Sequence, residues 1–270
     1  MKHIIVCFKL IYDYDQVLIS DWSHLASQEA DISYVRQIYN CFDESALELA
    51  LRMKDFYAAQ GEEIQLTALT VADESCLSFL KTLYAIGYDN VVRVDPIDPD
   101  AFSPLTVARQ IFSYIKSTGF SYDALLFGEK AAPFDSGQVP YYVAQLLQLP
   151  TLSGLTSLEA TKDGYLAHCR TETTLYKVQV TKPAVYLVGN CKQTYLRVPT
   201  LREKLRGSKK EITCRSYSHL EEKNIKPGRI LYEPKTRSSL MLEDASPKKL
   251  ALQLLEIIKR EGPTNENCRH

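Results

Sequence analysis

The sequence lacks both of the common nucleotide-binding fingerprints. Neither G-x-G-x-x-G nor G-x-x-x-x-G-K-[ST] occurs in the 270 residues, which argues against a Rossmann dehydrogenase and against a P-loop NTPase. No G-x-S-x-G elbow is present, and the five histidines lie beside no obvious nucleophile motif, so hydrolase chemistry has no residues to use. The sequence therefore favours a binding role over catalysis by its own side chains.

Close cysteine pairs and long apolar runs are also missing. The seven cysteines are scattered singly without a C-x-x-C, which is typical of reduced thiols in a cytoplasm and disfavours a structural zinc or iron–sulfur site. No secretory signal peptide precedes the first apolar run, and no run approaches the ~20 residues of a membrane helix. We therefore expect a cytoplasmic protein with no membrane insertion and no metal.

A large net charge is absent as well, since the formal value is −1. No overall field would draw the chain to nucleic acid or to an anionic membrane. A basic run at 202–210 could bind nucleic acid through counterion release, but Tyr195 is the only aromatic residue beside it. A solvated or partner-facing surface is the favoured interpretation, so we expect no nucleic-acid partner.

The first half of the chain alternates short apolar runs with helical patterns. The apolar runs, which are typical of strands buried on both faces, lie at 3–8, 64–71, 90–94 and 123–128. The helical patterns lie at 40–61, at 73–87, at 103–118 and in the stretch before Pro150. This alternation predicts right-handed crossovers and a doubly wound, mostly parallel α/β sheet with helices on both faces.

Helix ends can be predicted from single residues. Asp43 is placed to cap the helix at 40–61, and Glu48 is placed to pair with Arg52 one turn later. Glycines that can adopt the left-handed conformation are placed to end three helices. They are Gly61, Gly87 and Gly119.

The pattern changes after residue 150. The segment from Thr156 to Asn190 contains three or four strand patterns and no helical pattern, with a hairpin turn at 162–164. We expect these antiparallel strands to extend or cross the same sheet, and we expect an irregular, basic stretch at 195–235. The predicted parts are an α/β adenine-nucleotide-binding domain with an antiparallel extension (1–194), a recognition loop and linker (195–245), a C-terminal helix (246–262) and a disordered tail (263–270).

The loop before the helix that ends near Pro150 is the strongest candidate site. Gly128 ends a predicted strand, and ligands of open α/β sheets bind beyond the carboxyl ends of the strands. Asp135 can cap the following helix, with Gln138 at the spacing of a capping box. Ser136 and Gly137 would present backbone N–H groups at the positive end of that helix, which suits a phosphate. A well-capped helix without a ligand would show the same pattern.

Other strand ends should gather at the same rim of the sheet. Cys7, Phe8 and Lys9 end the first strand, Asn40 to Phe42 precede the next helix, and Val71 ends the second strand. Together they could form a slot for a flat base, with its phosphates directed at residues 135–139. The sequence thus predicts a nucleotide site of neither common type.

Three segments resemble the beta subunit of electron-transfer flavoproteins. The first strand ends in Cys-x-Lys, with Asp13 and Tyr14 shortly after it. "NCFDESALELA" (40–50) follows the family pattern Asn-Pro-Phe-x-Glu-x-Ala-(hydrophobic)-Glu-x-Ala, except that Cys41 replaces the proline. "GEKAAPFDSGQV" (128–139) follows the family's Asp-x-x-Gly-Gln-Val loop, except at Pro133 to Asp135. The order and spacing of these segments, and the elements that flank them, agree with the family pattern over about residues 1–210.

The resemblance implies a heterodimer in which the alpha subunit contributes most of an FAD site and the beta subunit covers part of that flavin. It also implies a second nucleotide in the slot of this chain, which is AMP in carrier-type members and a second FAD in electron-bifurcating members. Tyr14 would lie near the partner's flavin. The implied cofactor-binding residues are Cys7, Phe8, Lys9, Tyr14, Asn40, Phe42, Val71, Gly128, Asp135, Ser136, Gly137, Gln138 and Val139.

Two prolines in the loop bear on which nucleotide the slot holds. Pro133 and Pro140 each remove a backbone donor, and Pro140 and Phe134 stand where the family usually has glycine. A pyrophosphate needs several free N–H groups, so these departures slightly favour AMP, or an empty slot, over a second FAD.

The segment at 194–210 resembles the family's recognition loop, which docks an acyl-CoA or other flavin dehydrogenase. Tyr195, Thr200 and Leu201 would make the contact, with Thr200 and Leu201 at the tip. A protruding leucine can fill a partner pocket while adjacent charges set the encounter rate. Alternatively, Leu201 could start a short helix and pack inward. The wide apolar face of the helix at 246–262 is expected to dock on the alpha subunit.

The combined prediction is a beta subunit that shuttles electrons to or from flavin dehydrogenases through the FAD held mainly by the alpha subunit. Two alternatives remain open. One is a bifurcating complex that oxidises NADH through a second FAD in the slot. The other is a nucleotide-binding module of the adenine-alpha-hydrolase kind without a redox partner.

Overall fold

The computed structural model shows an α/β unit and a C-terminal helix. The chain divides into two compact units between Ile230 and Leu231. The tail predicted at 263–270 lies outside the described residues. The described residues are 2–18, 34–97, 103–119, 121–132, 135–189, 191, 195–217, 240–243 and 246–261.

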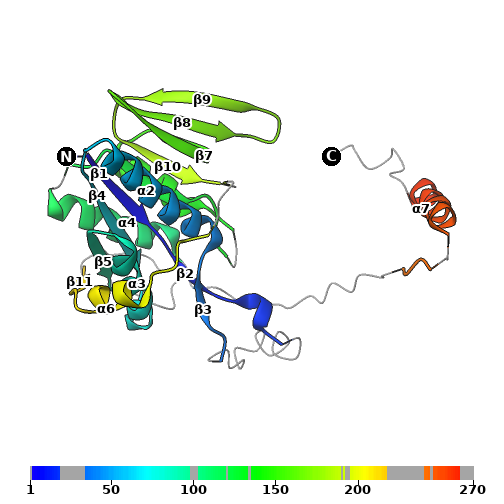
Figure 1. The fold of residues 1–270 in the computed structure, drawn as a ribbon, viewed down its shortest axis with the longest axis horizontal. Helices are drawn as coiled ribbons and strands as arrows, with labels where there is room; N and C mark the ends of the chain where they lie inside the picture. The colour runs from blue at the N-terminus through cyan, green and yellow to red at the C-terminus, as the bar shows by residue number, and fades with distance from the viewer. Residues whose placement is uncertain are drawn as a thin grey trace. The chain divides into compact units, whose positions relative to one another are not determined.

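Nine of the described strands form one sheet in the first unit (Figure 1). The strands are β1 (Lys2–Cys7), β4 (Ile64–Val71), β5 (Asn90–Val94), β6 (Ala124–Gly128), β7 (Thr151–Thr161), β8 (Gly164–Arg170), β9 (Leu175–Val180), β10 (Ala184–Val188) and β11 (Thr213–Arg215). Their order across the sheet is β11-β5-β4-β1-β6-β10-β7-β8-β9. The neighbouring pairs from β11 to β7 are parallel, and β8 and β9 are antiparallel.

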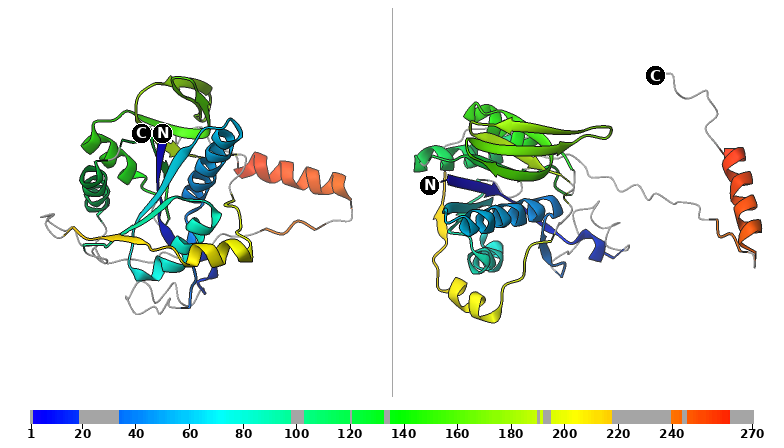
Figure 2. Two further views of the ribbon diagram at one scale, coloured as in Figure 1. Left: turned by 60° about the vertical axis from the view of Figure 1, so that its left-hand side comes forward. Right: turned by 45° about the horizontal axis from the view of Figure 1, so that its top comes forward.

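Helices cover both faces of this sheet (Figures 1 and 2). The helices of this first unit are α2 (Cys41–Ala59), α3 (Leu77–Ile86), α4 (Pro104–Thr118), α5 (Gln138–Leu147) and α6 (Leu201–Ser208), with short 3-10 turns η1 (Tyr14–Gln16) and η2 (Glu74–Cys76). Helix α7 (Pro247–Glu261) belongs to the second unit. Gly87 and Gly119 end α3 and α4 with φ of 118° and 62°, as predicted. None of the helices in these ranges has both the length and the apolar composition of a membrane span.

The buried strand residues alternate between two hydrophobic cores. In β1, Ile4 and Val6 pack in the core beneath α2 and α3, and Ile5 and Cys7 pack in the core beneath α4 and α5. The other central strands alternate in the same way, because successive side chains of a strand point to opposite faces. A sheet that is buried on both sides explains the continuous apolar runs, and the predicted doubly wound α/β class is confirmed.

The predicted antiparallel extension is also confirmed, with one addition. β7 and β8 form a hairpin through the turn at 162–164, and β9 pairs with β8. β10, by contrast, returns to the middle of the sheet and lies parallel between β6 and β7. Its residues Ala184–Val188 are all buried, which fits a central position.

The prediction of an irregular stretch at 195–235 was wrong for its first part. Helix α6 begins there with a capping box in which Thr200 and Glu203 satisfy each other's backbone N–H groups. Strand β11 follows and pairs with β5 at the edge of the sheet. Gly207 allows α6 to lie against α3, since an added Cβ would lie 2.8 Å from the backbone nitrogen of Ala85. From residue 218 to 235 the predicted stretch lies outside the described residues.

The chain reverses its winding direction between β1 and β6, which are adjacent strands. The connections from β1 to β5 pass over one face with α2 and α3, and those from β5 to β7 pass over the other face with α4 and α5. Such a reversal leaves a crevice beyond the carboxyl ends of the two strands, where ligands of open α/β sheets bind. In this chain the crevice lies beyond Cys7 and Gly128.

Candidate functional site

A hollow of about 330 Å³ lies at the carboxyl ends of β1, β4 and β6, and we call it the slot. Its volume lies at the low end of the range of about 300–1,000 Å³ for ligand sites. The structure brings nine of the predicted cofactor-binding residues together in its wall. They are Cys7, Phe8, Lys9, Val71, Gly128, Ser136, Gly137, Gln138 and Val139.

Helix α5 begins two residues later than a capping box at Asp135 requires, so that prediction was wrong. The helix starts at Gln138, its N-cap is Gly137, and no side chain caps it. Asp135 has a φ of 48° and donates its N–H to the carbonyl of Ala131 at 2.9 Å. The local turn uses Asp135 as a left-handed residue, which aspartate tolerates better than most residues.

The backbone donors at the start of α5 are therefore available to a ligand. Among the described residues, no hydrogen bond uses the N–H groups of Ser136, Gly137, Gln138 or Val139. Gly137 has a φ of 56°, and an added Cβ would lie 2.6 Å from the carbonyl oxygen of Glu129. The loop consequently requires glycine at this position, and its donors suit an oxyanion.

A second helix N-terminus lines the same slot. α4 begins at Pro104, and its N-cap Ser103 accepts a hydrogen bond from the N–H of Thr106 at 3.2 Å. Ser103 and Pro104 both line the slot, and so do the cations Lys9 and Lys130. Two helix dipoles and two lysines at one hollow favour a negatively charged ligand. Sequence reasoning missed this contribution, because Ser103 lies far along the chain from the loop at 128–139.

A single buried carboxylate holds the two strands at the slot together. Asp43 accepts the N–H of Lys9 on one oxygen at 2.9 Å and the N–H of Gly128 on the other at 2.7 Å. The prediction that Asp43 caps α2 was wrong, since the N-cap is Asn40. Asp43 lies in the first turn, where its side chain faces the sheet and reaches two strand ends instead.

The environment of Asp43 affects its protonation. Burial raises the pKa of Asp43 to about 6, and hydrogen bonds from the N–H groups of Lys9 and Gly128 oppose this rise. Burial also raises the pKa of the Cys7 thiol well above its ordinary value, so Cys7 contributes a protonated wall side chain. Neither group is arranged as a nucleophile for the slot.

Two polar side chains fix the loop that covers the slot. Lys9 donates to the carbonyl of Ala132 at 3.0 Å, and the amide of Asn40 donates to the carbonyl of Lys130 at 2.8 Å. The backbone N–H of Asn40 donates in turn to the carbonyl of Lys9 at 3.1 Å. Asn40 therefore positions the loop and is absent from the slot wall that we describe.

The remaining predicted cofactor-binding residues lie outside the slot. Asn40, Phe42 and Asp135 line a neighbouring hollow of about 540 Å³, whose aromatic walls also include Tyr39 and Phe79. Tyr14 lies in η1, next to the ribbon that β2 (Leu10–Tyr12) and β3 (Gln37–Tyr39) form. Its ring contacts that of Tyr12 at 6.5 Å between centroids. Burial raises the pKa of Tyr14.

The segment at 195–205, which we call the docking segment after the partner contact predicted for it, carries four exposed apolar side chains. Tyr195, Val198, Leu201 and Leu205 are 83%, 85%, 74% and 59% exposed. Thr200 is the N-cap of α6, and Leu201 begins the helix. Leu201 thus starts a short helix, as one alternative predicted, but it faces solvent and does not pack inward.

Carboxylates of α2 hold the docking segment in place. Glu44 accepts the N–H of Leu196, and Glu48 accepts the N–H of Arg197, both at 3.0 Å. The Arg197 guanidinium also pairs with Glu48 and Asp55, each at 2.9 Å. Burial opposes the ionisation of Glu48, but the hydrogen bonds from Arg197 hold its pKa below the ordinary value.

Only part of this anchoring could be predicted from the sequence. The predicted pair of Glu48 with Arg52 is present at 3.2 Å, but the contact of Glu48 with Arg197 was missed. Both Glu44 and Glu48 belong to the "NCFDESALELA" segment, whose third acidic residue, Asp43, faces the sheet instead. A buried glutamate in an amphipathic helix, like Glu48, is the signal that could have indicated a distant cation.

Comparison with known proteins gives a consistent result. Residues 31–213 match the family described as electron transfer flavoprotein domain. The electron transfer flavoprotein beta subunit of Bacillus subtilis (strain 168) is 24% identical over 96% of this chain and 98% of its own length. The beta subunit of Syntrophomonas wolfei is 24% identical over 95% of each chain. The protein YgcR of Escherichia coli (strain K12), named as an electron transfer flavoprotein subunit, is 27% identical over 78% of this chain and 80% of its own.

Substitution of Gly128 should separate the two strand ends. A Cβ at Gly128 would lie 2.8 Å from both Asp43 N and Phe42 Cβ, and closer still to an Asp43 oxygen. We expect Gly128→Ala to lower the free energy of unfolding by about 2–3 kcal/mol, measured by urea denaturation. The control is Gly119→Ala, where nothing lies within 4 Å and only the positive φ costs about 1 kcal/mol. Equal losses of unfolding free energy in the two variants would contradict the inference that Asp43 holds the two strand ends together.

The raised pKa of Asp43 predicts a pH-dependent contribution to stability. In the folded state the Asp43 carboxyl keeps its proton up to a pH of about 6, whereas an aspartate in the unfolded chain loses its proton near pH 3.9. The contribution of this group is therefore greatest below about pH 4 and declines as pH rises to about 6. We expect the difference in unfolding free energy between wild type and Asp43→Asn to fall by about 3 kcal/mol over that window. A difference that stays constant between pH 4 and pH 7 would contradict this prediction.

Proposed function

The chain belongs to the electron transfer flavoprotein domain family, and on that premise we propose that it is the beta subunit of a heterodimeric electron carrier. The complex would pass electrons to or from a flavin dehydrogenase through an FAD held mainly by the alpha subunit. The observation that carries the proposal for this chain is the slot, where two helix N-termini and two lysines face the crevice between β1 and β6.

The slot of this chain would hold AMP. Its apolar wall, which includes Leu69, Val71 and Ile111, suits a flat base, and the N–H groups at the start of α5 suit a phosphate. Pro140 supplies no donor in the first turn of that helix. A volume of about 330 Å³ supports a mononucleotide more than the larger FAD. The AMP would have a structural role, since no nucleophile or general base in the slot is poised to act on it.

The shared FAD would lie nearer the aromatic-walled hollow than the slot. Phe42, Tyr39 and Phe79 line that hollow, and apolar aromatic walls suit a flavin ring. Tyr39 is fixed there, because its hydroxyl donates to the carbonyl of Phe79 at 3.0 Å. The chemistry that FAD supplies when bound is electron transfer, and the residues of this chain would shape its surroundings and exclude water.

The docking segment would contact the dehydrogenase. Its four exposed apolar side chains stand beside the cations Arg202, Lys204 and Arg206 of α6. Apolar anchors contribute binding energy and surrounding charges speed the encounter, which is a combination suited to a transient electron-transfer contact.

Helix α7 would dock on the alpha subunit. Leu252, Leu254, Leu255 and Ile258 of this helix are each about half exposed, so the helix presents an apolar face. A face of that kind needs a partner to bury it.

The nucleotide assignment can be tested at Ser136. This residue lines the slot, is exposed, and has no positive φ, so a substitution does not strain the loop as one at Gly137 would. Ser136→Asp places a negative charge beside the phosphate donors, and we expect it to lower bound AMP by about tenfold or more. Ser136→Asn has nearly the same size without the charge and should retain AMP.

The measurement is a denaturing extraction of the co-expressed two-subunit complex, with FAD and AMP counted per heterodimer. One FAD and one AMP in the wild type are expected. Two FAD per heterodimer would indicate the bifurcating alternative. If Ser136→Asp kept its full nucleotide content, the phosphate site would have to lie elsewhere.

The docking assignment can be tested at Leu201. We expect Leu201→Ala to lower kcat/KM for reduction by the partner dehydrogenase about fivefold to tenfold, because an anchor side chain is lost. Flavin content should not change. Leu77→Ala, at the exposed start of α3, is the control and should leave the rate unaltered. Loss of flavin in Leu201→Ala would show instead that the segment is part of the flavin site.

A further inference from the structure

We propose that the first turn of α2 couples the slot to the docking segment, so that a nucleotide in the slot orders the backbone that presents Tyr195. We call residues 40–44 the coupling turn. This inference rests on the proposed function, since it assumes that the slot holds AMP and that the docking segment meets a dehydrogenase. It gives the nucleotide a second role, which is control over the surface that the dehydrogenase contacts.

The coupling turn contacts the rim of the slot through two buried residues. Asn40 donates its backbone N–H to the carbonyl of Lys9 at 3.1 Å and its side-chain amide to the carbonyl of Lys130 at 2.8 Å. Asp43 accepts the N–H of Lys9 at 2.9 Å and the N–H of Gly128 at 2.7 Å. Asn40 and Asp43 are only 2% and 5% exposed. The position of the turn therefore follows the position of the strand ends and of the loop after Gly128.

The same turn holds the docking segment through its next residue. Glu44 accepts the N–H of Leu196 at 3.0 Å, and in the described part of the chain that N–H has no second acceptor. The Leu196 side chain packs in the core beneath α2, so Glu44 controls the amide and the residue before it. That residue is the exposed Tyr195. A displacement of Glu44 consequently releases the backbone that presents Tyr195.

The coupling turn depends on its contacts with the slot rim for its order. Asn40 is the N-cap of α2, but its side chain makes no cap hydrogen bond, because its amide serves Lys130 instead. The hydroxyl of Ser45 donates to the carbonyl of Cys41 at 3.0 Å, a bond that competes with those of the helix backbone. Cys41 leaves φ free at the first helical position, where a proline would fix it. Helix ends open at the lowest free-energy cost, so the turn has an ordered and a frayed state.

An anion in the slot stabilises the ordered state. Lys9 and Lys130 line the slot together with the N-termini of α4 and α5, so groups of one sign face each other across it. A phosphate attracts both lysines and the N–H groups at 136–139 at once, which fixes the two carbonyls to which Asn40 donates. Without the anion these positive groups repel one another. The rim and the coupling turn then loosen together.

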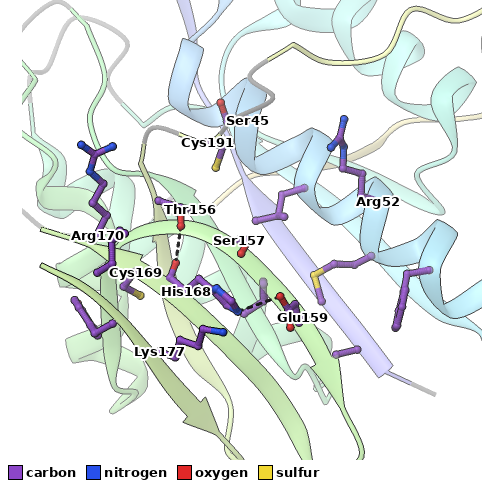
Figure 3. A pocket seen from close by; sticks show the side chains of 17 residues that line it. Ser45, Arg52, Thr156, Ser157, Glu159, His168, Cys169, Arg170, Lys177 and Cys191 are labelled. Atoms are coloured by element: carbon purple, nitrogen blue, oxygen red, sulfur yellow. Dashed lines mark hydrogen bonds and ion pairs between the residues drawn. The ribbon is translucent and has the colours of Figure 1, made fainter.

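The next turn of α2 is held firmly and should not respond to the slot. Ser45 and Glu48 are 2% and 4% exposed, and Glu48 accepts the N–H of Arg197 at 3.0 Å and pairs with its guanidinium at 2.9 Å. Figure 3 shows this part of the helix, with Ser45 and Arg52 labelled, beside the strands β7–β9 across a hollow of about 1,010 Å³. The neighbouring amides of Leu196 and Arg197 should therefore differ, because only the first depends on the slot.

The experiment measures hydrogen exchange of single amides in the co-expressed two-subunit complex, with AMP bound and after AMP has been removed by dialysis. Removal of AMP is expected to speed exchange of the Leu196 amide about fivefold or more. The Arg197 amide and the amides of β8 should change little. FAD and AMP are counted per heterodimer in each sample, so that the occupancy of the slot and the integrity of the complex are known.

A proline at position 41 tests the coupling turn itself. Asn40 has φ −61° and ψ 133°, an extended conformation that a following proline accepts, and proline is favoured at the first position of a helix. Cys41→Pro should hold the turn in its ordered state, so that the Leu196 amide exchanges slowly with and without AMP. Cys41→Ala removes the thiol without fixing φ. It is the matched control and should keep the wild-type dependence on AMP.

A second pair of variants tests the link to the docking segment. Glu44→Ala removes the acceptor of the Leu196 N–H, so this amide should exchange rapidly with and without AMP. Glu44→Gln retains an acceptor oxygen and should keep the dependence on AMP. This pair decides the question if Cys41→Pro yields no folded complex, and equal exchange in Glu44→Ala and Glu44→Gln overturns the proposal.

The proposal is supported if exchange of the Leu196 amide depends on AMP in the wild type and in Cys41→Ala but not in Cys41→Pro. Equal exchange in the wild type with and without AMP overturns the coupling while the proposed function stands, and so does a full AMP dependence in Cys41→Pro. An equal rise at Leu196, Arg197 and β8 also overturns it, since a ligand that only stabilises the whole fold gives that result. A wild-type complex that holds no AMP overturns the nucleotide assignment and the coupling together.

Discussion

The carboxylate of Asp43 is the contact on which the geometry of the candidate site depends. Its two oxygens accept the N–H groups of Lys9 and Gly128, so one helix residue fixes the spacing of two strand ends. These ends lie where the chain reverses its winding, and both the slot and the loop at 129–137 begin there. A neutral side chain with a single acceptor could satisfy only one of the two donors.

Helix α2 supports both proposed binding surfaces with neighbouring side chains. Asp43 faces the slot, and Glu44 and Glu48 hold the docking segment. The proposed nucleotide and dehydrogenase would therefore bind surfaces built on one helix. Secondary structure of this kind positions a site more precisely than a loop can.

Sequence patterns predicted the parts of the fold that local chemistry determines. The apolar run at 64–71 coincides with β4, and Gly87 and Gly119 end their helices as expected. The strand ends at 7–9 and at Val71 and the loop at 128–139 were predicted to meet in one slot, and residues from each of them line it. The predictions that failed concern the contacts of single side chains with residues far along the chain. Asp43 and Asp135 were both assigned as caps, because the sequence cannot show that the first serves two strand ends or that the second adopts a left-handed turn. The anchoring of Leu196 and Arg197 was missed for the same reason, since α2 and the docking segment meet only in the folded chain.

The ion-pair network around Arg197 would influence how fast the docking segment associates with its proposed partner. Arg197 is held by Glu48 and Asp55, and Glu48 also holds Arg52. The backbone that presents Tyr195, Val198 and Leu201 is therefore already ordered before an encounter, and little conformational entropy remains to be lost when it binds. A preorganised surface with few anchors can associate rapidly without a long residence time. For a carrier that must leave one protein to reach the next, a short lifetime of each complex is the useful property.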